Sequence, residues 1–176
     1  EFIAISVEIR KEQGEAFDPI KGLFNEYELM YVIADEQDVI KLRTNYRNDT
    51  VYLYPVTMSQ KEIQTLFLSM LERTNKLREQ PEFYNTLSST CTTNIVDHLN
   101  TLPEKDLPFS IKIVFPEYSD SYFQKQGLLT IEKTIEGAHM QYKINAKAAH
   151  YANESDFSLK IREPWMAPQN LSYRVP

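Results

Sequence analysis

Cys91, the single cysteine of this chain, is the residue best suited to act as a nucleophile. Apolar side chains recur at helical spacing after it, which predicts a helix from about Thr90 to Leu102 with a cap from Thr90 or Ser89. Cys91 would then lie in the first turn, where unpaired backbone N–H groups and the helix dipole stabilise a thiolate. A lone cysteine is more often a small buried apolar side chain, so that alternative stays open.

A thiolate nucleophile needs an imidazole within hydrogen-bond reach, and the chain contains His98, His139 and His150. His98 shares a face of the predicted helix with Cys91, but seven residues correspond to about 10.5 Å of axial rise. That separation is too long for a direct hydrogen bond, so we interpret His98 as a core residue or one that supports the site indirectly. His139 and His150 fall in a weakly patterned region and are expected at the surface.

Other chemistries find little support in the sequence. Asp35, Glu36 and Asp38 form an acidic run in a turn-like segment, where solvated charge is the usual explanation. No cluster of His, Cys and Asp has the spacing of metal ligands, and no glycine-rich loop could hold a phosphate. We therefore expect neither a metal ion nor another cofactor.

The regular elements that would position these residues can be read from periodicity. Strict alternation predicts a strand over residues 2–10, and aromatic and β-branched residues predict further strands over 27–33 and 50–55. Residues 38–46 fit a helix or a hairpin equally well. Because a half-buried strand at residues 2–10 needs a neighbour, we expect a pairing strand before it in the parent protein.

A capping-box pattern begins at Ser59 and ends at Glu62, and it predicts a helix that runs toward Arg78 and stops before Pro81. Beyond Pro103 the pattern weakens. The sequence as a whole indicates an α+β domain.

Length and composition limit the classes of function. The 176 residues, 42% of them hydrophobic, suit one globular domain rather than a disordered chain. The formal net charge is −6 without a continuous basic surface, so nucleic acid is not an expected partner. No apolar run approaches the roughly eighteen residues that a membrane-spanning helix needs.

The segment Phe83 to Thr93, with Cys91 near its end, resembles the Lnb N-terminal periplasmic domain family. Further matching motifs are Ser6–Arg10, Gly22–Phe24, Tyr27–Leu29, Asp35–Thr44, Val51–Pro55, Asp156–Ser158 and Ile161–Arg162.

The resemblance implies a circularly permuted fold similar to NlpC/P60 and lecithin:retinol acyltransferase-like enzymes. In this papain-like fold an antiparallel sheet packs on the helix that bears the cysteine. Residues 1–104 would form a papain-like core without its first strand. In the family, that first strand carries the histidine. Residues 105–176 would form a C-terminal extension that packs on this core.

The resemblance also implies a mechanism. Cys91 would attack an ester or amide carbonyl, form a thioester, and pass the acyl group to water or an amine. The oxyanion would accept hydrogen bonds from the backbone N–H of Thr92 or of Cys91 itself. Tyr84 and Asn85 belong to the cysteine motif. On the strand at residues 2–10, Glu8 would orient the histidine, although a solvated strand face explains this carboxylate equally well.

The implied substrates are lipids, lipoproteins or peptides, and the implied location is the periplasm or cell envelope of a Gram-negative bacterium. A binding or scaffolding module that has lost the chemistry is the alternative. A further alternative is docking on a partner or membrane surface through four aromatic residues: Tyr118, Tyr122, Phe123 and Trp165.

Overall fold

The computed structural model describes residues 2–131 and 134–163, and the chain divides into two compact units. The first unit comprises residues 1–4, 34–54 and 132–176, and the second comprises 5–33 and 55–131. Both units therefore draw on residues beyond position 104 as well as before it. The assignment of residues 1–104 to a papain-like core stays a prediction.

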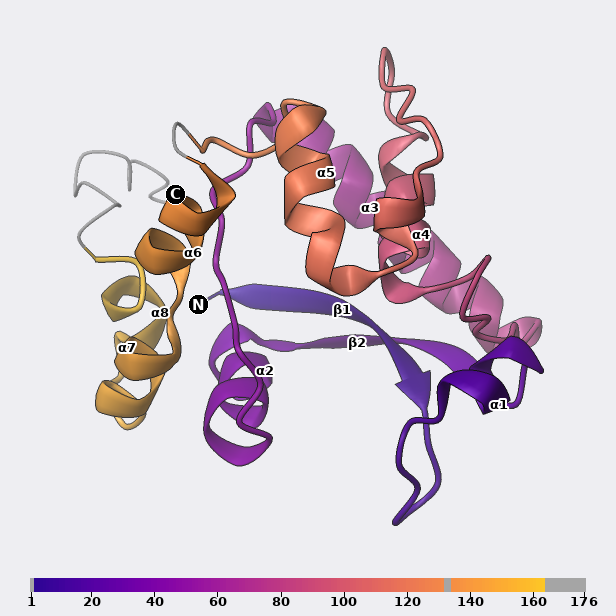
Figure 1. Ribbon diagram of the computed structural model, residues 1–176, viewed down its shortest axis with the longest axis horizontal. Coiled ribbons are helices and arrows are strands. Elements are labelled where there is room, and N and C mark those ends of the chain that lie inside the picture. The colour runs from indigo at the N-terminus through magenta and orange to yellow at the C-terminus, as the bar shows by residue number, and fades with distance from the viewer. Residues whose placement is uncertain (1, 132–133, 164–176) are drawn as a thin grey trace. The chain divides into compact units, whose positions relative to one another are not determined.

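Two antiparallel strands form the sheet (Figure 1), and both were predicted. Strand β1 spans Ile3–Arg10 and strand β2 spans Glu28–Asp35. Val7 and Leu29 are buried, whereas Ile3, which the period of two places on the same face as Val7, is exposed. Together with the helices, this sheet gives a mixed α+β structure.

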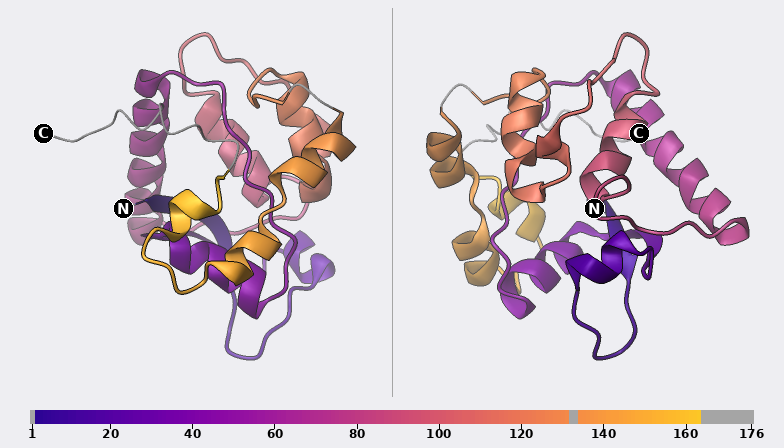
Figure 2. Two further views of the ribbon diagram at one scale, coloured as in Figure 1. Left: turned by 90° about the vertical axis from the view of Figure 1, so that its left-hand side faces the viewer. Right: turned by 45° about the vertical axis from the view of Figure 1, so that its right-hand side comes forward.

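The second unit is built mainly from helices. These are α1 (Pro19–Leu23), α3 (Gln60–Glu79), α4 (Cys91–Leu99) and α5 (Ser119–Lys125), with short 3₁₀ turns at Ile111–Ile113 and Pro116–Tyr118. The predicted capping box starts α3: the backbone N–H of Glu62 donates to Ser59 Oγ, and the Glu62 carboxylate accepts from the backbone N–H of Ser59. Helices α3 and α4 run side by side (Figures 1 and 2).

Two apolar clusters hold this unit together. One joins Val7 and Leu29 of the sheet to Met70 of α3, so the sheet packs on the helices. The other gathers side chains of α4 and of the segment that follows it, namely Val96, Leu99, Leu102, Leu107, Ile113, Tyr122 and Leu128. Because these later residues complete the core around α4, residues 105–131 belong to the same compact unit as the cysteine-bearing helix.

The first unit has its own small core. Its helices are α2 (Glu36–Lys41), which continues as a π-helical turn over Leu42–Tyr46, α6 (Ile135–Tyr142), α7 (Asn145–His150) and α8 (Phe157–Lys160). Ile40, Ile144, Ala148, Phe157 and Ile161 form the buried cluster. Residues 38–46 are therefore helical, which decides between the two readings that the sequence left open.

The prediction of a strand over residues 50–55 is wrong, because this segment does not join the two-stranded sheet. Tyr52 forms only an isolated antiparallel bridge with Lys143, in which Leu53 N–H donates to the Tyr142 carbonyl at 3.0 Å. The β-branched and aromatic residues of this segment instead serve burial, because Val51 and Leu53 pack against the core of the first unit.

Glu36 also departs from expectation, because it is buried rather than solvated. Arg162 pairs with it through two hydrogen bonds, from Nη1 to Oε2 at 2.8 Å and from Nη2 to Oε1 at 2.5 Å. The guanidinium also lies 4.8 Å from the centre of the Phe2 ring. A bidentate partner explains how a carboxylate can leave water at this position.

Candidate functional site

Cys91 is the first residue of α4, and Thr90 caps the helix before it. Thr90 Oγ1 accepts from Thr93 N–H at 3.1 Å, while Thr93 Oγ1 accepts from Thr90 N–H at 2.7 Å. The Thr90 side chain is completely buried, and its hydroxyl also lies 3.3 Å from the Ile113 carbonyl. The helix start is therefore fixed by a reciprocal cap that a threonine pair provides.

The Cys91 side chain is half-buried beside the sheet. It packs against the cluster of Val7, Leu29 and Met70, and its Sγ atom lies 3.9 Å from Thr92 Oγ1. Its position thus combines a helix start with partial exposure.

The backbone around Cys91 leaves two amide groups uncommitted. Thr93 N–H donates to the Thr90 side chain, and Asn94 N–H donates to the Thr90 carbonyl at 3.1 Å. The first amides of an α-helix have no acceptor within the helix. Within the described part of the chain, the N–H groups of Cys91 and Thr92 meet no other acceptor.

Asn85 organises the loop that leads to Cys91. Its backbone exchanges hydrogen bonds with Ser89, at 3.1 and 2.9 Å, and its Oδ1 atom accepts from the N–H groups of Leu87 and Ser88. Its amide nitrogen donates to the Leu23 carbonyl at 3.1 Å. Asn85 therefore shapes the backbone before α4, and the hydrogen bonds of its side chain go to Leu23, Asn25, Leu87 and Ser88 rather than to Cys91.

Tyr84 is buried next to the site. Burial raises the pKa of its hydroxyl, and the neighbouring thiolate charge of Cys91 raises this pKa further, which keeps the phenol neutral. Gly22 allows this packing, because a Cβ atom there would lie 2.3 Å from Thr86 Oγ1 and 3.2 Å from Tyr84 Cε1.

Glu8 lies on β1, where its Oε1 atom accepts from the Ser6 hydroxyl at 2.5 Å. This contact fixes the carboxylate along the strand. The role of Glu8 in orienting a histidine stays a prediction.

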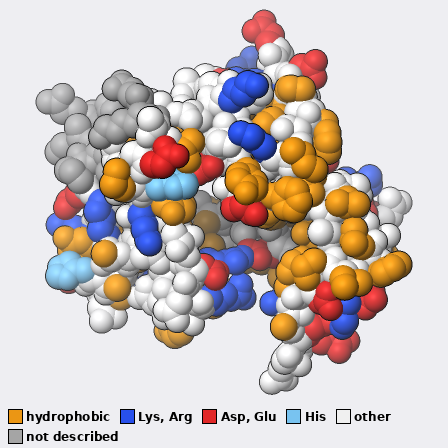
Figure 3. Space-filling view, viewed as in Figure 1, with side chains coloured by type: hydrophobic (Ala, Val, Ile, Leu, Met, Phe, Trp, Pro, Cys, Tyr) orange, Lys and Arg blue, Asp and Glu red, His pale blue; other side chains and the backbone are white. Residues whose placement is uncertain are grey.

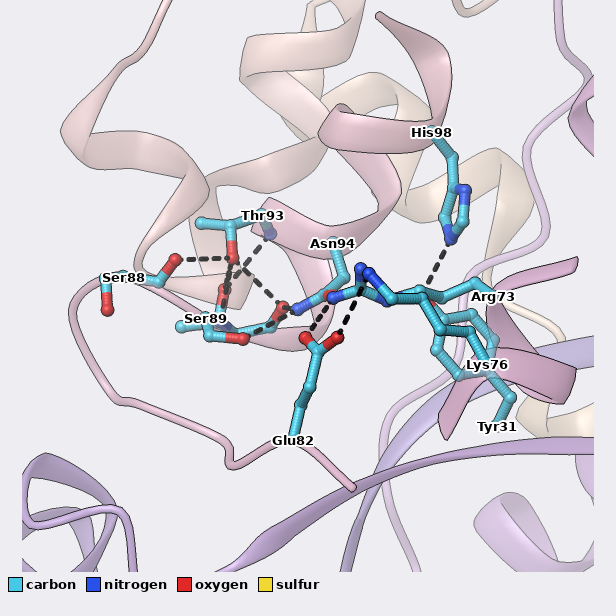
Figure 4. A network of polar contacts seen from close by, with 10 residues as sticks. Tyr31, Arg73, Lys76, Glu82, Ser88, Ser89, Thr93, Asn94 and His98 are labelled. Carbon is cyan, nitrogen blue, oxygen red and sulfur yellow. Dashed lines mark hydrogen bonds and ion pairs between the residues drawn. The ribbon is translucent and has the colours of Figure 1, made fainter. Parts of the chain in front are cut away.

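His98 forms a separate polar network with residues of β2 and α3 (Figure 4). Its Nε2 atom lies 2.7 Å from the Tyr31 hydroxyl, and its Nδ1 atom lies 2.8 Å from the Ser69 hydroxyl. Because both ring nitrogens already have partners, His98 is not placed as the base for Cys91.

Burial controls the ionisation of this network. It lowers the pKa of His98, with a further reduction from the charge of Arg73, and it raises the pKa of Tyr31 to about 12. A neutral imidazole has one donor and one acceptor. The hydroxyls of Tyr31 and Ser69 must therefore take opposite roles, one accepting from the ring and the other donating to it.

The other two histidines belong to the first unit. His139 stacks on Tyr52 with 4.4 Å between ring centres, and His150 meets Tyr151 edge-on. His150 is exposed and His139 is partly buried.

The four aromatic residues considered for surface docking differ in exposure. Tyr122 is buried and donates to the Pro108 carbonyl, Phe123 packs on the core, and Tyr118 is 53% exposed. Trp165 lies outside the described residues. Other hydrophobic side chains reach the surface over α1 (Figure 3), where Ile20 and Phe24 are 64% and 73% exposed.

Ser69 and Tyr31 were missed by the sequence reasoning. Ser69 is one polar residue inside α3, and Tyr31 is an aromatic residue of the kind that strands commonly contain, so neither carries a local signal. Only their approach to His98 in three dimensions gives them a role.

Among the residues that the structure describes, no helix has both the length and the hydrophobicity needed to cross a membrane. Comparison with curated proteins and with solved structures found no match. The profile of the Lnb N-terminal periplasmic domain family matches residues 2–117, which is more than half of the chain, and the protein therefore belongs to this family.

Proposed function

We propose that this protein is a periplasmic cysteine-dependent acyltransferase or hydrolase of a Gram-negative cell envelope, acting on lipids, lipoproteins or peptides. One observation carries the proposal: Cys91 begins α4 with the N–H groups of the first two helical residues uncommitted. The membership of the family supports a function in the periplasm.

In this mechanism the Cys91 thiolate attacks a carbonyl carbon and forms a tetrahedral intermediate. The oxyanion accepts hydrogen bonds from the N–H groups of Cys91 and Thr92, which are preorganised by the Thr90 cap. Collapse of the intermediate breaks the bond to the leaving alcohol or amine and leaves a thioester. Water or an amine then attacks the thioester and regenerates the thiol.

The proton of the thiol goes to a histidine in enzymes that resemble this family. In the NlpC/P60-like arrangement that we propose, this histidine lies on a strand that pairs with β1, and Glu8 orients its ring. Tyr84 supports the thiolate indirectly, because a phenol with a raised pKa adds no second negative charge beside the sulfur.

The first test is the rate of Cys91 alkylation by iodoacetamide as a function of pH. The proposal expects a midpoint below the value of about 8.5 for an ordinary thiol, because the helix start favours the thiolate. Cys91→Ala is the matched control and should take up no label. A midpoint at or above that of a free thiol would contradict the proposal.

The second test is chemical capture of the intermediate. After incubation with an activated acyl ester, the intact mass should increase by one acyl group, and hydroxylamine should remove it because thioesters are labile to this reagent. Cys91→Ser separates the outcomes, since an acyl adduct on serine resists the same treatment. Labelling at lysines alone would show that the sulfur does not react.

A binding or scaffolding module is the second candidate function. It is favoured by the packing of Cys91 against apolar side chains and by the engagement of both His98 ring nitrogens elsewhere. In that case ligand binding should persist in Cys91→Ala, and the wild-type thiol should alkylate no faster than a free cysteine at neutral pH.

A further inference from the structure

Helix α1 turns its large apolar side chains toward the solvent. Its buried residue is Gly22, which faces the second unit, since a Cβ atom there would lie 3.2 Å from Tyr84 Cε1. Because successive helical residues are rotated by about 100°, Ile20 and Phe24 lie opposite Gly22 and Leu23 lies on the flank. Their exposed fractions follow this order, at 64% for Ile20, 73% for Phe24 and 41% for Leu23. A helix that covers a core normally has the reverse orientation.

A hydrogen-bonded loop extends this apolar face. The side chain of Asn85 donates from Nδ2 to the Leu23 carbonyl at 3.1 Å, and its Oδ1 atom accepts from Leu87 N–H at 3.0 Å. Leu23 and Leu87 are therefore neighbours held by one carboxamide, and Leu87 is 57% exposed. Figure 3 shows hydrophobic side chains gathered over α1. The name α1 patch is used below for four residues: Ile20, Leu23, Phe24 and Leu87.

The composition of the α1 patch distinguishes between possible occupants. All four side chains are hydrocarbons without a hydrogen-bond donor or acceptor. Protein interfaces derive much of their binding energy from Trp, Tyr and Arg, which combine contact area with hydrogen bonds. A hydrocarbon phase offers no hydrogen-bond partners and penalises unpaired polar groups. The side chains of the α1 patch therefore fit the acyl layer of a lipid surface better than they fit a protein partner.

The charges around the α1 patch select the kind of lipid. Lys21, the one basic residue of α1, donates to Glu15 at 2.9 Å. Asp18 caps the helix by accepting from Ile20 N–H at 2.8 Å, and Glu26 follows the helix in sequence. Binding to anionic headgroups needs clusters of uncommitted cations. The paired lysine, the flanking carboxylates and the formal net charge of −6 instead fit a zwitterionic phospholipid.

We propose that the α1 patch inserts into the outer layer of a zwitterionic phospholipid surface, as exposed apolar helix faces do at membranes. The loop that completes the patch also leads to the proposed nucleophile, because the backbone of Asn85 pairs with that of Ser89, two residues before Cys91. Insertion thus places the start of α4 near the acyl esters of the lipid. This last step rests on the proposed function, whereas the binding to lipid does not.

The test is co-sedimentation of the full chain with phosphatidylcholine vesicles. We expect saturable binding, and the double variant Ile20→Gln with Phe24→Gln should weaken it at least tenfold. Both side chains are exposed, so the midpoint of urea unfolding should stay at the wild-type value. The matched control is Met140→Gln on α6, which replaces an 83% exposed apolar side chain of the first unit and should change binding by less than twofold.

A fluorescent reporter tests insertion without weakening the patch. Phe24→Trp in a Trp165→Phe background leaves one tryptophan in the chain. Its emission should shift to shorter wavelength when vesicles are added, and brominated phosphatidylcholine should quench it. Met140→Trp in the same background should show neither effect. An unshifted and unquenched Phe24→Trp would overturn the proposal.

The other occupants give different results. A wild-type dimer in sedimentation velocity that the double variant dissociates would assign the α1 patch to a second copy and overturn the proposal. Binding that requires phosphatidylglycerol and falls with salt, or equal binding of the double variant, would do the same. Cys91→Ala should bind vesicles like the wild type. Vesicle binding without reactivity of Cys91 would reject the proposed function alone, and reactivity without vesicle binding would reject this proposal alone.

Discussion

The hydroxyl of Tyr31 on β2 lies 2.7 Å from Nε2 of His98 on α4. This contact joins the sheet to the helix that begins with Cys91, and Ser69 of α3 completes the junction from the other side of the ring. Three elements therefore meet at one neutral imidazole. The imidazole that ties α4 to the sheet and to α3 is therefore distinct from the histidine that the proposed chemistry of Cys91 requires.

We expect the protein to lose stability as the pH falls below about 6.5, the ordinary pKa of histidine. Burial lowers the pKa of His98 in the folded state, so the unfolded chain binds more protons between the folded pKa and this value. The contribution of His98 to the free energy of unfolding is fully present at pH values above its pKa in the unfolded chain. It is lost as the pH falls through its pKa in the folded protein. Urea denaturation between pH 5 and pH 8 measures it.

His98→Gln is the control for this pH dependence. Glutamine keeps a donor and an acceptor but does not titrate, so the slope of unfolding free energy against pH should become shallower in the variant. An identical slope in the two proteins would show that other groups cause the loss. A direct measurement of the ring by NMR should give a pKa below about 6.5, the ordinary value of histidine.

The two hydroxyls on either side of His98 should be energetically coupled. Tyr31→Phe and Ser69→Ala each remove one hydrogen bond at a buried ring, at an expected cost of about 1 to 2 kcal/mol. With both hydroxyls present, the tautomer of the neutral His98 ring decides which hydroxyl donates and which accepts. When one hydroxyl is removed, the ring can adopt either tautomer to bond with the remaining one. A double-mutant cycle in urea should therefore be non-additive, and strictly additive losses would contradict the shared network.

The features that sequence could predict are local ones. The alternation in β1, the capping box of Ser59 and Glu62, and the helix start at Cys91 each depend on residues within a few positions of one another. Such patterns report local propensity directly, and the strand and the two helix starts that they predict are present in the structure.

The features that sequence missed depend on contacts between distant residues. Residues 50–55 have the composition of a strand, but their neighbour is the short segment at Lys143, too brief to form a ladder. Glu36 looks solvated until Arg162, 126 residues later, is placed beside it. Ser69 acquires a role only through His98. Local periodicity contains no information on these pairings.

Replacement of Gly22 by alanine should disturb the loop before Cys91. The added Cβ would lie 2.3 Å from Thr86 Oγ1, so the Thr86 side chain, which donates a hydrogen bond to the Pro19 carbonyl, must give way. We expect a loss of about 1 to 3 kcal/mol in unfolding free energy. The double variant Gly22→Ala with Thr86→Ala removes the closest contact and should recover much of the loss. No recovery would mean that the backbone of α1, rather than this contact, is the cause.

The ion pair of Glu36 and Arg162 should be essential to the first unit. Their side chains are 10% and 13% exposed, so Glu36→Gln leaves a buried guanidinium without its counter-charge. The expected cost is about 3 to 5 kcal/mol. Lys160→Gln is the control, because it breaks a more exposed pair with Glu163 and should cost less than about 1 kcal/mol. Similar losses in the two variants would show that burial of the pair is unimportant.

Thr90 should link the stability of α4 to the reactivity of the sulfur. Thr90→Val keeps the shape of a completely buried side chain but removes the acceptor for Thr93 N–H, at an expected cost of about 1 to 2 kcal/mol. Loss of the cap should also let the first turn fray, which raises the pH midpoint of Cys91 alkylation.

Two control variants separate these effects. Thr90→Ser retains the capping oxygen and should keep the wild-type midpoint, whereas Ser59→Ala removes the equivalent cap from α3 and should lower stability without changing the thiol. If Thr90→Val were destabilised as expected but alkylated with an unchanged pH profile, the helix start would not be what tunes Cys91. The thiol would then owe its reactivity, if any, to groups outside the first turn, and the proposed oxyanion donors would lose their structural basis.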